Sequence, residues 1–585
     1  MDKQAFFDGT MFDAYRWFGA HLEGDTAVFR TFAPNASRIT VTGACNGWGE
    51  TGLTQDGRSG FWEGRVTGAA AGQFYKYRIY GANGTVTEHC DPYGFAMELR
   101  PGCCSVITEL DEYTFTDAEW MQTRTSSPDA PLNIYEMHLG SWRRSPDNEN
   151  GWYRYDEIAD LLIPYLQKNG FTHVEFLPLS EHPFDGSWGY QNTGFFAPTA
   201  RYGTPAQLKA LIDRLHQAGI GAIMDFVPVH FAVDSYGLAR YDSTPLYEYP
   251  HVAVGESEWG SYNFIHSRRE VRCFLQSAAN YWLEEFHFDG LRMDAVSRLI
   301  YWQGDPARGV NGDTLAFLKM MNQGLKDRHP TALLLAEDST AYPGVTKPLE
   351  QDGLGFDYKW DLGWMHDTLE YFQTPPDERP LYRGKLLFSM QYFPNEHYLL
   401  PLSHDEVVHG KAAIVQKMWG ADLTDKYAQA RAFYLYMFAH PGKKLNFMGN
   451  ELGLRTEWSE AGELDWTYEN GPFHTFFRAL CAAYRAHPAL HADYAPDSFR
   501  WCEPDPDAPC VFALERRSAD ETLLAVCNFA DEVYTFDAPH GAELVLHTAW
   551  PQFGGNPDAD APAGDALTLP AFSAALLRLA PSEPA

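Results

Sequence analysis

The chain has 585 residues, of which 45% are hydrophobic, so it can form about three or four domains with buried cores. Its formal net charge of −33 repels phosphate backbones and anionic lipid, which argues against nucleic acid and membrane surfaces as partners. Neutral substrates are not excluded, because they feel no net field.

Aromatic residues make up 15% of the chain, which suits a carbohydrate-binding protein, although large domains also have aromatic cores. The nine cysteines form no CxxC pair and no zinc-finger spacing. The N-terminal segment lacks the apolar stretch of a secretory signal, and no run of about 18 apolar residues could span a membrane. We therefore expect a cytoplasmic protein with reduced thiols and no metal site.

Short alternating strands are predicted over residues 1–115. The segments TAVFRTFAP, RITVTGAC, FWEGRV and QFYKYRIYG alternate apolar and polar residues and are separated by Gly, Asn and Pro turns. This pattern is typical of a small β-sandwich. Residues 116–130 are polar (TRTSSPDAP) and are interpreted as a linker.

The pattern changes over residues 131–487, where short apolar runs alternate with helix-length segments. Helices are predicted for YDEIADLLIPYLQKNG, PAQLKALIDRLHQAG and REVRCFLQSAANYWLEEF. Eight apolar runs are candidate strands: LNIYEMH, HVEFLPL, GAIMDFV, FDGLRMDA, ALLLAED, FDYKW, YLLPLSH and KKLNFMG. Parallel strands joined by helices predict a (β/α)8 TIM barrel with insertions. A doubly wound open sheet is the main alternative, but it would be expected to carry a Gly-rich phosphate loop, and none is found.

Residues 488–585 return to short strands, CVFALERR, TLLAVCNFA, AELVLHTAW and AALLRLA, separated by turns rich in Pro, Gly and Asp. They predict a second, C-terminal β-sandwich. The Asp/Ala/Pro-rich stretch near residues 556–564 is expected to be a loop. The predicted fold class is thus α/β, a barrel flanked by two β-sandwiches.

Charged residues follow four of the predicted barrel strands. In such barrels the carboxyl ends of the strands face the active site. Each residue alone has an ordinary explanation, such as a helix cap for an aspartate or a hydrogen-bonded structural position for a histidine. Their occurrence at four strand ends together predicts a catalytic site. In chain order they are Asp225 and His230, Arg292 and Asp294, Glu337 and Asp338, and His404, Asp405 and Glu406.

Glycosyl transfer is the chemistry that needs such a set. A retaining mechanism uses one carboxylate as nucleophile and a second carboxyl group about 5–5.5 Å away, which protonates the leaving oxygen and later acts as base. The nucleophile must stay ionised, and a neighbouring arginine favours that state. Arg292 and Asp294 are two positions apart on a predicted strand, so their side chains point to the same side.

Four segments resemble the signature regions of the α-amylase superfamily: DFVPVH at 225–230, DGLRMDAV at 289–296, AED at 336–338 and LSHDE at 402–406. The resemblance implies that Asp294 is the nucleophile and Glu337 the general acid/base. It implies that Asp405 is a third carboxylate that holds sugar hydroxyls in the distorted transition state. The candidate substrate-binding residues at these ends are Asp225, His230, Arg292 and His404.

Longer stretches are most similar to one subgroup, the glycogen branching enzymes. They are NIYEMHLGSWRR at 133–144, THVEFLPLSEHPFDGSWGYQNTGFFAPTARYG at 172–203, LPLSHDEVVHGK at 400–411 and KKLNFMGNELG at 443–453. Within the second, Tyr190 matches the aromatic residue expected to stack under the reacting glucose. The N-terminal FRTFAPNASRITVTGACNGW resembles the carbohydrate-binding module that precedes such barrels, and Trp48 and Trp62 are candidate glucan platforms there.

The resemblance implies a 1,4-α-glucan branching enzyme, which cleaves an α-1,4 linkage and re-forms it as an α-1,6 branch in glycogen biosynthesis. Glycogen or amylose would be donor and acceptor, the protein would act as a monomer, and the route needs neither a metal nor an organic cofactor. One alternative is an α-glucan hydrolase of debranching or amylase type, against which the long branching-enzyme stretches argue. The other is an inactive glucan-binding protein, against which the three carboxylates argue.

Overall fold

The computed structural model describes residues 1–503, 505–555 and 566–580, and the loop expected near residues 556–564 lies outside them. The chain divides into two compact units. The first consists of residues 1–124, 138–161 and 175–357, and the second of residues 125–137, 162–174 and 358–585. The domain boundaries expected from the sequence stay a prediction.

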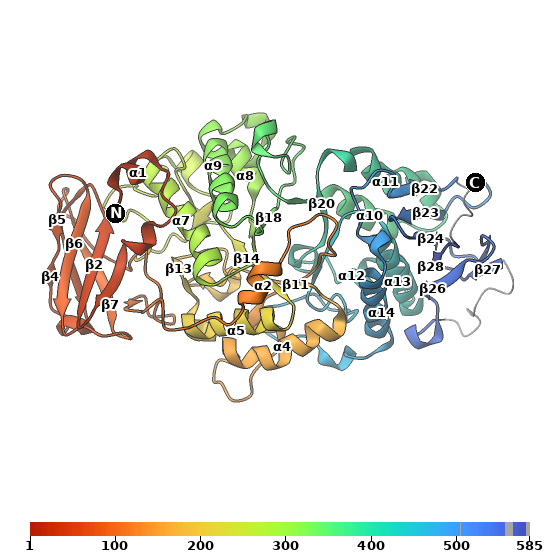
Figure 1. Ribbon diagram of the computed structural model, residues 1–585, viewed down its shortest axis with the longest axis horizontal. Coiled ribbons are helices and arrows are strands. Elements are labelled where there is room, and N and C mark those ends of the chain that lie inside the picture. Colours follow the sequence, from red (N-terminus) through yellow and green to blue (C-terminus); the bar gives the residue numbers. More distant parts are fainter. Residues whose placement is uncertain (504, 556–565, 581–585) are drawn as a thin grey trace. The chain divides into compact units, whose positions relative to one another are not determined.

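The N-terminal part of the first unit is a β-sandwich, as the alternating pattern predicts (Figure 1). Phe29 of one antiparallel sheet contacts Tyr75 of the other, with ring centroids 5.0 Å apart. One sheet has the order β1 (Gly19–Glu23), β2 (Thr26–Phe32), β6 (Phe61–Thr67), β5 (Thr54–Gln55). The other has the order β4 (Thr51–Gly52), β3 (Ala36–Gly43), β7 (Phe74–Gly81), β8 (Val86–His89), and β9 (Ser105–Val106) also pairs with β7.

The two candidate glucan platforms of this sandwich have opposite environments. Trp62 is only 5% exposed, and its Nε1 donates a hydrogen bond to the carbonyl oxygen of Ala33 at 2.9 Å. The prediction that Trp62 is a surface platform is therefore wrong, because both faces of β6 are buried where Phe61 and Trp62 lie. Trp48 is 54% exposed in the segment after β3, and its role as a platform stays a prediction.

The eight predicted barrel strands are confirmed: they form a closed barrel in chain order, which excludes the doubly wound open sheet. Within the first unit β14, β17 and β18 pair in parallel, and within the second β19, β20, β21 and β10 do so. The strands are β10 (Asn133–Met137), β11 (His173–Phe176), β14 (Gly221–Phe226), β17 (Gly290–Met293), β18 (Leu333–Ala336), β19 (Tyr358–Trp360), β20 (Tyr398–Leu402) and β21 (Lys443–Phe447).

Helices occupy the segments between most of these strands, as the helix-length periodic runs predict. Helix α5 shows why one begins where it does. Thr204 and Gln207 form a capping box at its start, and Pro205 takes the first helical position, where a missing N–H costs nothing. The main helices are α4 (Tyr155–Asn169), α5 (Pro205–Gln217), α7 (Arg269–Glu285), α9 (Gly312–Arg328), α10 (Leu362–Gln373), α11 (Arg379–Tyr392), α13 (Leu423–Ala439) and α14 (Pro472–Ala486).

A buried ion cluster fixes α5 to the amino ends of β14 and β17. His216 lies between two carboxylates, its Nδ1 2.7 Å from Asp117 and its Nε2 2.9 Å from Asp289. Asp289 also accepts the backbone N–H of Ala222 at 2.7 Å. Burial alone would lower the pKa of His216, but Asp289 and Asp117 outweigh burial and raise it to about 9. Asp117 precedes α2 (Ala118–Thr123), so the segment expected as a linker begins with an anchored helix.

The protein should lose stability at alkaline pH through His216. Its pKa is raised from 6.5 to about 9 on folding, so the stabilisation is complete below pH 6.5 and is lost as the pH rises through about 9. The shift corresponds to about 2–3 kcal/mol near neutral pH. Thermal unfolding of the wild type and of His216→Gln at pH 7 and pH 10 checks this. The Tm gap between the two proteins should narrow at pH 10, and a constant gap would contradict the charged cluster.

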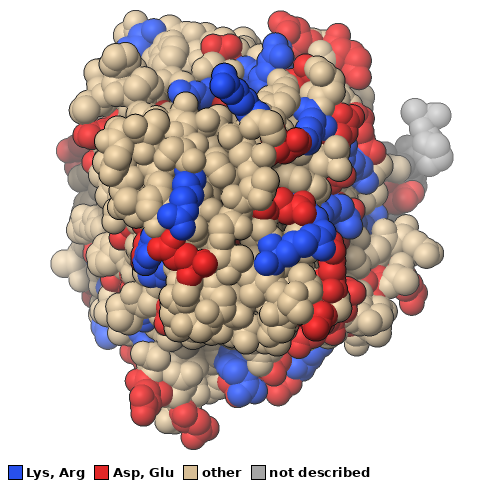
Figure 2. Space-filling view, turned by 90° about the vertical axis from the view of Figure 1, so that its left-hand side faces the viewer, with Lys and Arg blue, Asp and Glu red and all other residues tan. Residues whose placement is uncertain are grey.

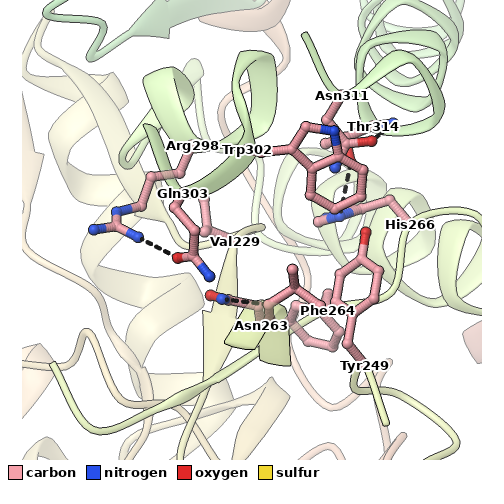
Figure 3. A pocket seen from close by; sticks show the side chains of 11 residues that line it. Val229, Tyr249, Asn263, Phe264, His266, Arg298, Trp302, Gln303, Asn311 and Thr314 are labelled. Atoms are coloured by element: carbon pink, nitrogen blue, oxygen red, sulfur yellow. Dashed lines mark hydrogen bonds between the residues drawn. The ribbon is translucent and has the colours of Figure 1, made fainter. Parts of the chain in front are cut away.

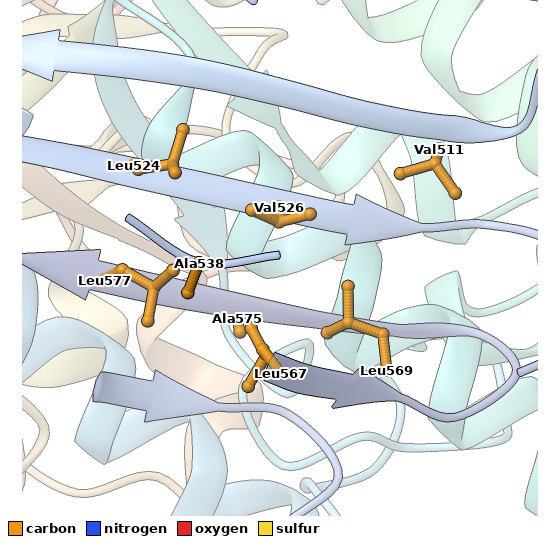
Figure 4. Packing of buried hydrophobic residues seen from close by; sticks show 8 residues of the cluster. All are labelled: Val511, Leu524, Val526, Ala538, Leu567, Leu569, Ala575 and Leu577. Atoms are coloured by element: carbon orange, nitrogen blue, oxygen red, sulfur yellow. The ribbon is translucent and has the colours of Figure 1, made fainter. Parts of the chain in front are cut away.

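The C-terminal β-domain lies in the second unit, and the strands predicted there are confirmed. Its sheet has the order β22 (Phe499–Trp501), β23 (Val511–Arg517), β24 (Thr522–Asn528), β28 (Ser573–Arg578), β26 (Glu543–His547). A second sheet pairs β25 (Tyr534–Asp537) with β27 (Ala566–Leu569). A buried apolar cluster fills this domain (Figure 4): Val511, Leu524, Val526, Ala538, Leu567, Leu569, Ala575 and Leu577.

Buried charges hold this domain to barrel strand β21 of the same unit. Asp493 accepts a hydrogen bond from Arg516 of β23 at 2.8 Å, and Lys443 of β21 lies 3.0 Å away. Burial alone would raise the pKa of the Asp493 carboxyl, but Lys443 and Arg516 hold it well below its usual range.

Two further features concern the cysteines and the helices. All nine cysteines are free, and no helix among the described residues is long and apolar enough to cross a membrane.

Candidate active site

Three neighbouring strands of the first unit bring the predicted charged residues together. Asp225 of β14 lies opposite Arg292 of β17 in the parallel register, and Met293 lies opposite Ala336 at the end of β18. Asp294 and Glu337 come directly after these strand ends. The carboxyl ends of parallel strands share one edge of the sheet, and the side chains therefore meet there.

Arg292 is the centre of this cluster. Its NH1 donates to Asp225 at 2.6 Å and to Asp294 at 3.1 Å, and its NH2 donates to Glu337 at 2.9 Å. Glu337 also accepts the backbone N–H of Ala295 at 2.8 Å. One guanidinium thus holds three carboxylates at fixed positions, which a point charge on a flexible stem could not do.

The charged side chains of the cluster differ in their exposure to solvent. The side chains of Arg292 and Asp225 are 1% exposed, whereas those of Asp294 and Glu337 are 13% and 20% exposed. Burial opposes the charge of Arg292, but Asp225 and its other anionic neighbours raise its pKa well above the usual value. Arg292 is therefore a permanent cation, and only Asp294 and Glu337 of the three carboxylates present a surface to a ligand.

Tyr190 joins the same cluster. Its hydroxyl donates to Asp225 at 2.6 Å and accepts from Arg292 at 3.2 Å. Its ring centroid lies 5.7 Å from the guanidinium carbon of Arg292. The half-buried ring is thus held beside the nucleophile candidate, and its stacking under a glucose stays a prediction.

His230 lies near Oδ2 of Asp294, whereas Arg292 donates to Oδ1. It belongs to the short strand β15 (His230–Phe231), which pairs with β16 (Tyr262–Asn263), and its Nε2 is 4.0 Å from Asp294. Burial, and then the charge of Arg298, lower the pKa of His230 to about 3. The imidazole is therefore neutral at physiological pH and can donate one hydrogen bond without a competing charge.

The second unit holds the remaining predicted residues. His404 begins the short 3-10 helix η9 (His404–Val407) after β20, and its Nε2 lies 3.5 Å from Asp405. Its Nδ1 lies 2.5 Å from Glu136, which also accepts the backbone N–H of His404 at 3.0 Å. The Asp405 side chain is 51% exposed and so is open to a ligand.

Sequence reasoning missed Glu136, the buried carboxylate that orients His404. The sequence did contain a signal for it, a charged residue inside the apolar run NIYEM. A carboxylate is buried in a barrel strand only where a hydrogen-bond or ionic partner satisfies it, so Glu136 could have been predicted to have such a partner. Two other strand-end acids have partners outside the Arg292 cluster. Asp338 is 1% exposed and accepts hydrogen bonds from Thr340, and Glu406 forms an ion pair with Lys411 at 3.1 Å.

Known sequence families match parts of the chain. Carbohydrate-binding module 48 (isoamylase N-terminal domain) matches residues 17–94, and the α-amylase catalytic domain matches residues 148–245. The chain is 42% identical to a 1,4-alpha-glucan branching enzyme GlgB of Oleidesulfovibrio alaskensis, over 95% of this chain and 92% of the relative. Proteins of the same name from Rubrobacter xylanophilus and Bacillus caldolyticus are 41% and 40% identical, over 99% and 98% of this chain and 86% and 88% of theirs.

Solved structures share the fold at lower identity. A pullulanase complexed with maltotetraose, from Anoxybacillus sp. LM18-11, has a TM-score of 0.75 at 17% identity, covering 99% of this chain and 89% of that one. A putative alpha amylase from Salmonella typhimurium has a TM-score of 0.74 at 20% identity, covering 96% of this chain and all 100% of that one. At these identities the likeness shows the fold alone.

Proposed function

Because this chain belongs to the GlgB family of 1,4-α-glucan branching enzymes within the α-amylase superfamily, we propose that Asp294, Glu337 and Asp405 carry out its glycosyl transfer. The enzyme cleaves an α-1,4 linkage of a glucan and re-forms it as an α-1,6 branch in glycogen biosynthesis. The observation that supports this residue assignment is that the guanidinium of Arg292 donates hydrogen bonds to both Asp294 and Glu337.

The reaction runs as a double displacement. The Asp294 carboxylate attacks the anomeric carbon while the C–O bond to the leaving chain breaks, and Glu337 gives its proton to the departing 4-oxygen. A glycosyl ester on Asp294 results. Glu337, now a base, takes the proton of the 6-hydroxyl of an acceptor glucan, whose oxygen forms the α-1,6 bond and releases Asp294.

The neighbours of the two carboxylates have separate tasks in this scheme. Arg292 keeps Asp294 ionised and in place for attack, because its charge and its hydrogen bond both favour the carboxylate. Asp225 and Tyr190 fix the guanidinium from the buried side. Neutral His230, 4.0 Å from Asp294, is positioned to donate a hydrogen bond to a hydroxyl of the sugar bound there.

We propose, from the resemblance of LSHDE to its family region, that Asp405 and His404 bind sugar hydroxyls. Glu136 fixes the imidazole of His404, which leaves Nε2 beside the exposed Asp405. A carboxylate and an imidazole on adjacent residues are suited to binding neighbouring sugar hydroxyls, which supply an acceptor and a donor each. Such contacts lower the barrier where they strengthen as the sugar ring distorts.

The branching function is tested by incubating the protein with linear amylose and counting reducing ends before and after a debranching enzyme is added. Branching conserves reducing ends during the incubation, because each cleaved bond is replaced, and the count then rises on debranching. A count that rises during the incubation itself would indicate a hydrolase. A count that stays constant throughout would indicate a glucan-binding protein without activity.

We also propose that the N-terminal sandwich binds α-glucan through Trp48, and that the protein works as a cytoplasmic monomer. Several arginines of the sandwich are paired with acids; Arg78, for example, contacts Glu50 and Glu88 at 2.5 and 2.6 Å. On the face seen in Figure 2, basic and acidic side chains are interspersed between uncharged areas. Such a surface suits a neutral polymer better than a phosphate backbone.

A further inference from the structure

An exposed tryptophan lies beside the candidate active site and has no part in the mechanism above. Trp259, just before β16, is 46% exposed, although tryptophan is mostly buried in folded proteins. Its ring centroid is 5.4 Å from that of His230, with the two planes tilted by 39°. The indole of Trp259 thus contacts His230, which in turn lies near Asp294, and all three residues belong to the same unit.

The backbone around Trp259 is fixed. The backbone N–H of Trp259 donates to the hydroxyl of Ser257 at 3.2 Å, and that hydroxyl lies 2.6 Å from the hydroxyl of Ser261. The carbonyl oxygen of Trp259 accepts a hydrogen bond from Gln191, the residue after Tyr190, at 3.0 Å. The turn that carries the indole is thus joined to the segment that carries Tyr190.

The ring itself is held by Arg298. The guanidinium carbon of Arg298 lies 4.2 Å from the centroid of the indole, a cation–π contact, and the Arg298 side chain is 9% exposed. Arg298 donates to Gln303 at 3.1 Å (Figure 3) and forms an ion pair with Glu258 at 2.6 Å. An exposed aromatic ring fixed in this way loses little conformational entropy when a ligand stacks on it.

We propose that Trp259 is a stacking platform for a glucosyl unit of the bound α-glucan, next to the unit that reacts with Asp294. The proposal rests on the proposed function of Asp294. The ligand class follows from the chemistry of the ring: the C–H face of a glucose is flat and apolar, and an indole offers a matching face with one N–H at its edge. A charged ligand is not favoured, because Glu258 and Arg298 neutralise each other beside the ring.

Steady-state branching of amylose of defined length by Trp259→Ala and Trp259→Phe tests the platform. The alanine variant should raise KM about tenfold with kcat changed much less, and phenylalanine should restore KM to within about threefold of the wild type. The matched control is Phe388→Ala, which removes another exposed aromatic ring, 50% exposed on α11, and should leave KM unchanged.

An unchanged KM in Trp259→Ala would overturn the proposal. So would a loss of kcat together with a large fall in Tm that phenylalanine does not rescue, because that result describes a structural residue. The result for the Trp259 variants can be distinguished from a failure of the nucleophile assignment. Activity retained by an Asp294 variant would overturn the proposed function, whereas an unchanged KM in Trp259→Ala beside an inactive Asp294 variant would overturn the platform alone.

Discussion

Replacement of Asp294 by asparagine should lower the branching rate by a factor on the order of 10⁴. Asparagine keeps the size of the side chain and an oxygen that can accept the 3.1 Å hydrogen bond from Arg292, but its amide oxygen is too weak a nucleophile to form the glycosyl ester. The stability should change little, because Asp225 and Glu337 still balance the buried guanidinium. Initial rates of branch formation from amylose, measured beside Tm, check both parts.

The control for Asp294→Asn is Asp160→Asn, which removes an aspartate whose side chain is 73% exposed on the surface of α4. It should keep the wild-type rate and Tm. If Asp294→Asn retained more than about a tenth of the wild-type rate, Asp294 would not be the nucleophile. If it instead unfolded, the carboxylate would have a structural role that the contacts of Arg292 do not predict.

Replacement of Arg292 by lysine should lower the rate on the order of 100-fold or more and also destabilise the fold by about 2–4 kcal/mol. A single ammonium cannot occupy both the NH1 position, which serves Asp225 and Asp294, and the NH2 position, which serves Glu337. At least one carboxylate of the cluster then loses its partner. The Tm and the rate of branch formation should therefore fall together.

Arg214→Lys is the matched control for that substitution. Arg214 also pairs with an aspartate, Asp160 at 2.5 Å, but both side chains are well exposed, so the ion pair contributes little to stability. The control should behave as the wild type does. A rate within about threefold of wild type in Arg292→Lys would contradict the central position that the geometry gives this arginine.

The strands of the fold were predictable because the signal for each is local. A run such as GAIMDFV is apolar throughout because a barrel strand is covered on both faces, and it becomes β14 over Gly221–Phe226. The alternation in QFYKYRIYG likewise predicts β7, whose residues are buried in alternation. Trp62 shows the limit of this reasoning, since the beginning of β6 is buried on both faces and the indole of Trp62 is almost wholly buried.

The partners within the site were less predictable, because they depend on contacts between distant segments. The sequence places Glu337 and Asp338 side by side, yet Glu337 bonds to Arg292, whereas Asp338 turns to Thr340. Glu136 and His404 are 268 residues apart in the sequence, and no local sequence pattern predicts their hydrogen bond. Motif resemblance supplied the residue types, and the pairing of strands decides which of them share a partner.

Direct identification of the residue that carries the sugar tests the assignment of the nucleophile most directly. In Glu337→Gln, an α-maltooligosaccharyl fluoride can still glycosylate the nucleophile, because fluoride leaves without needing a proton, while glutamine cannot activate the acceptor. The ester should therefore accumulate, and mass spectrometry of the digested protein should find the added glycosyl mass on Asp294. Recovery of that mass on another residue, or its undiminished appearance in an Asp294→Asn/Glu337→Gln double variant, would contradict the account.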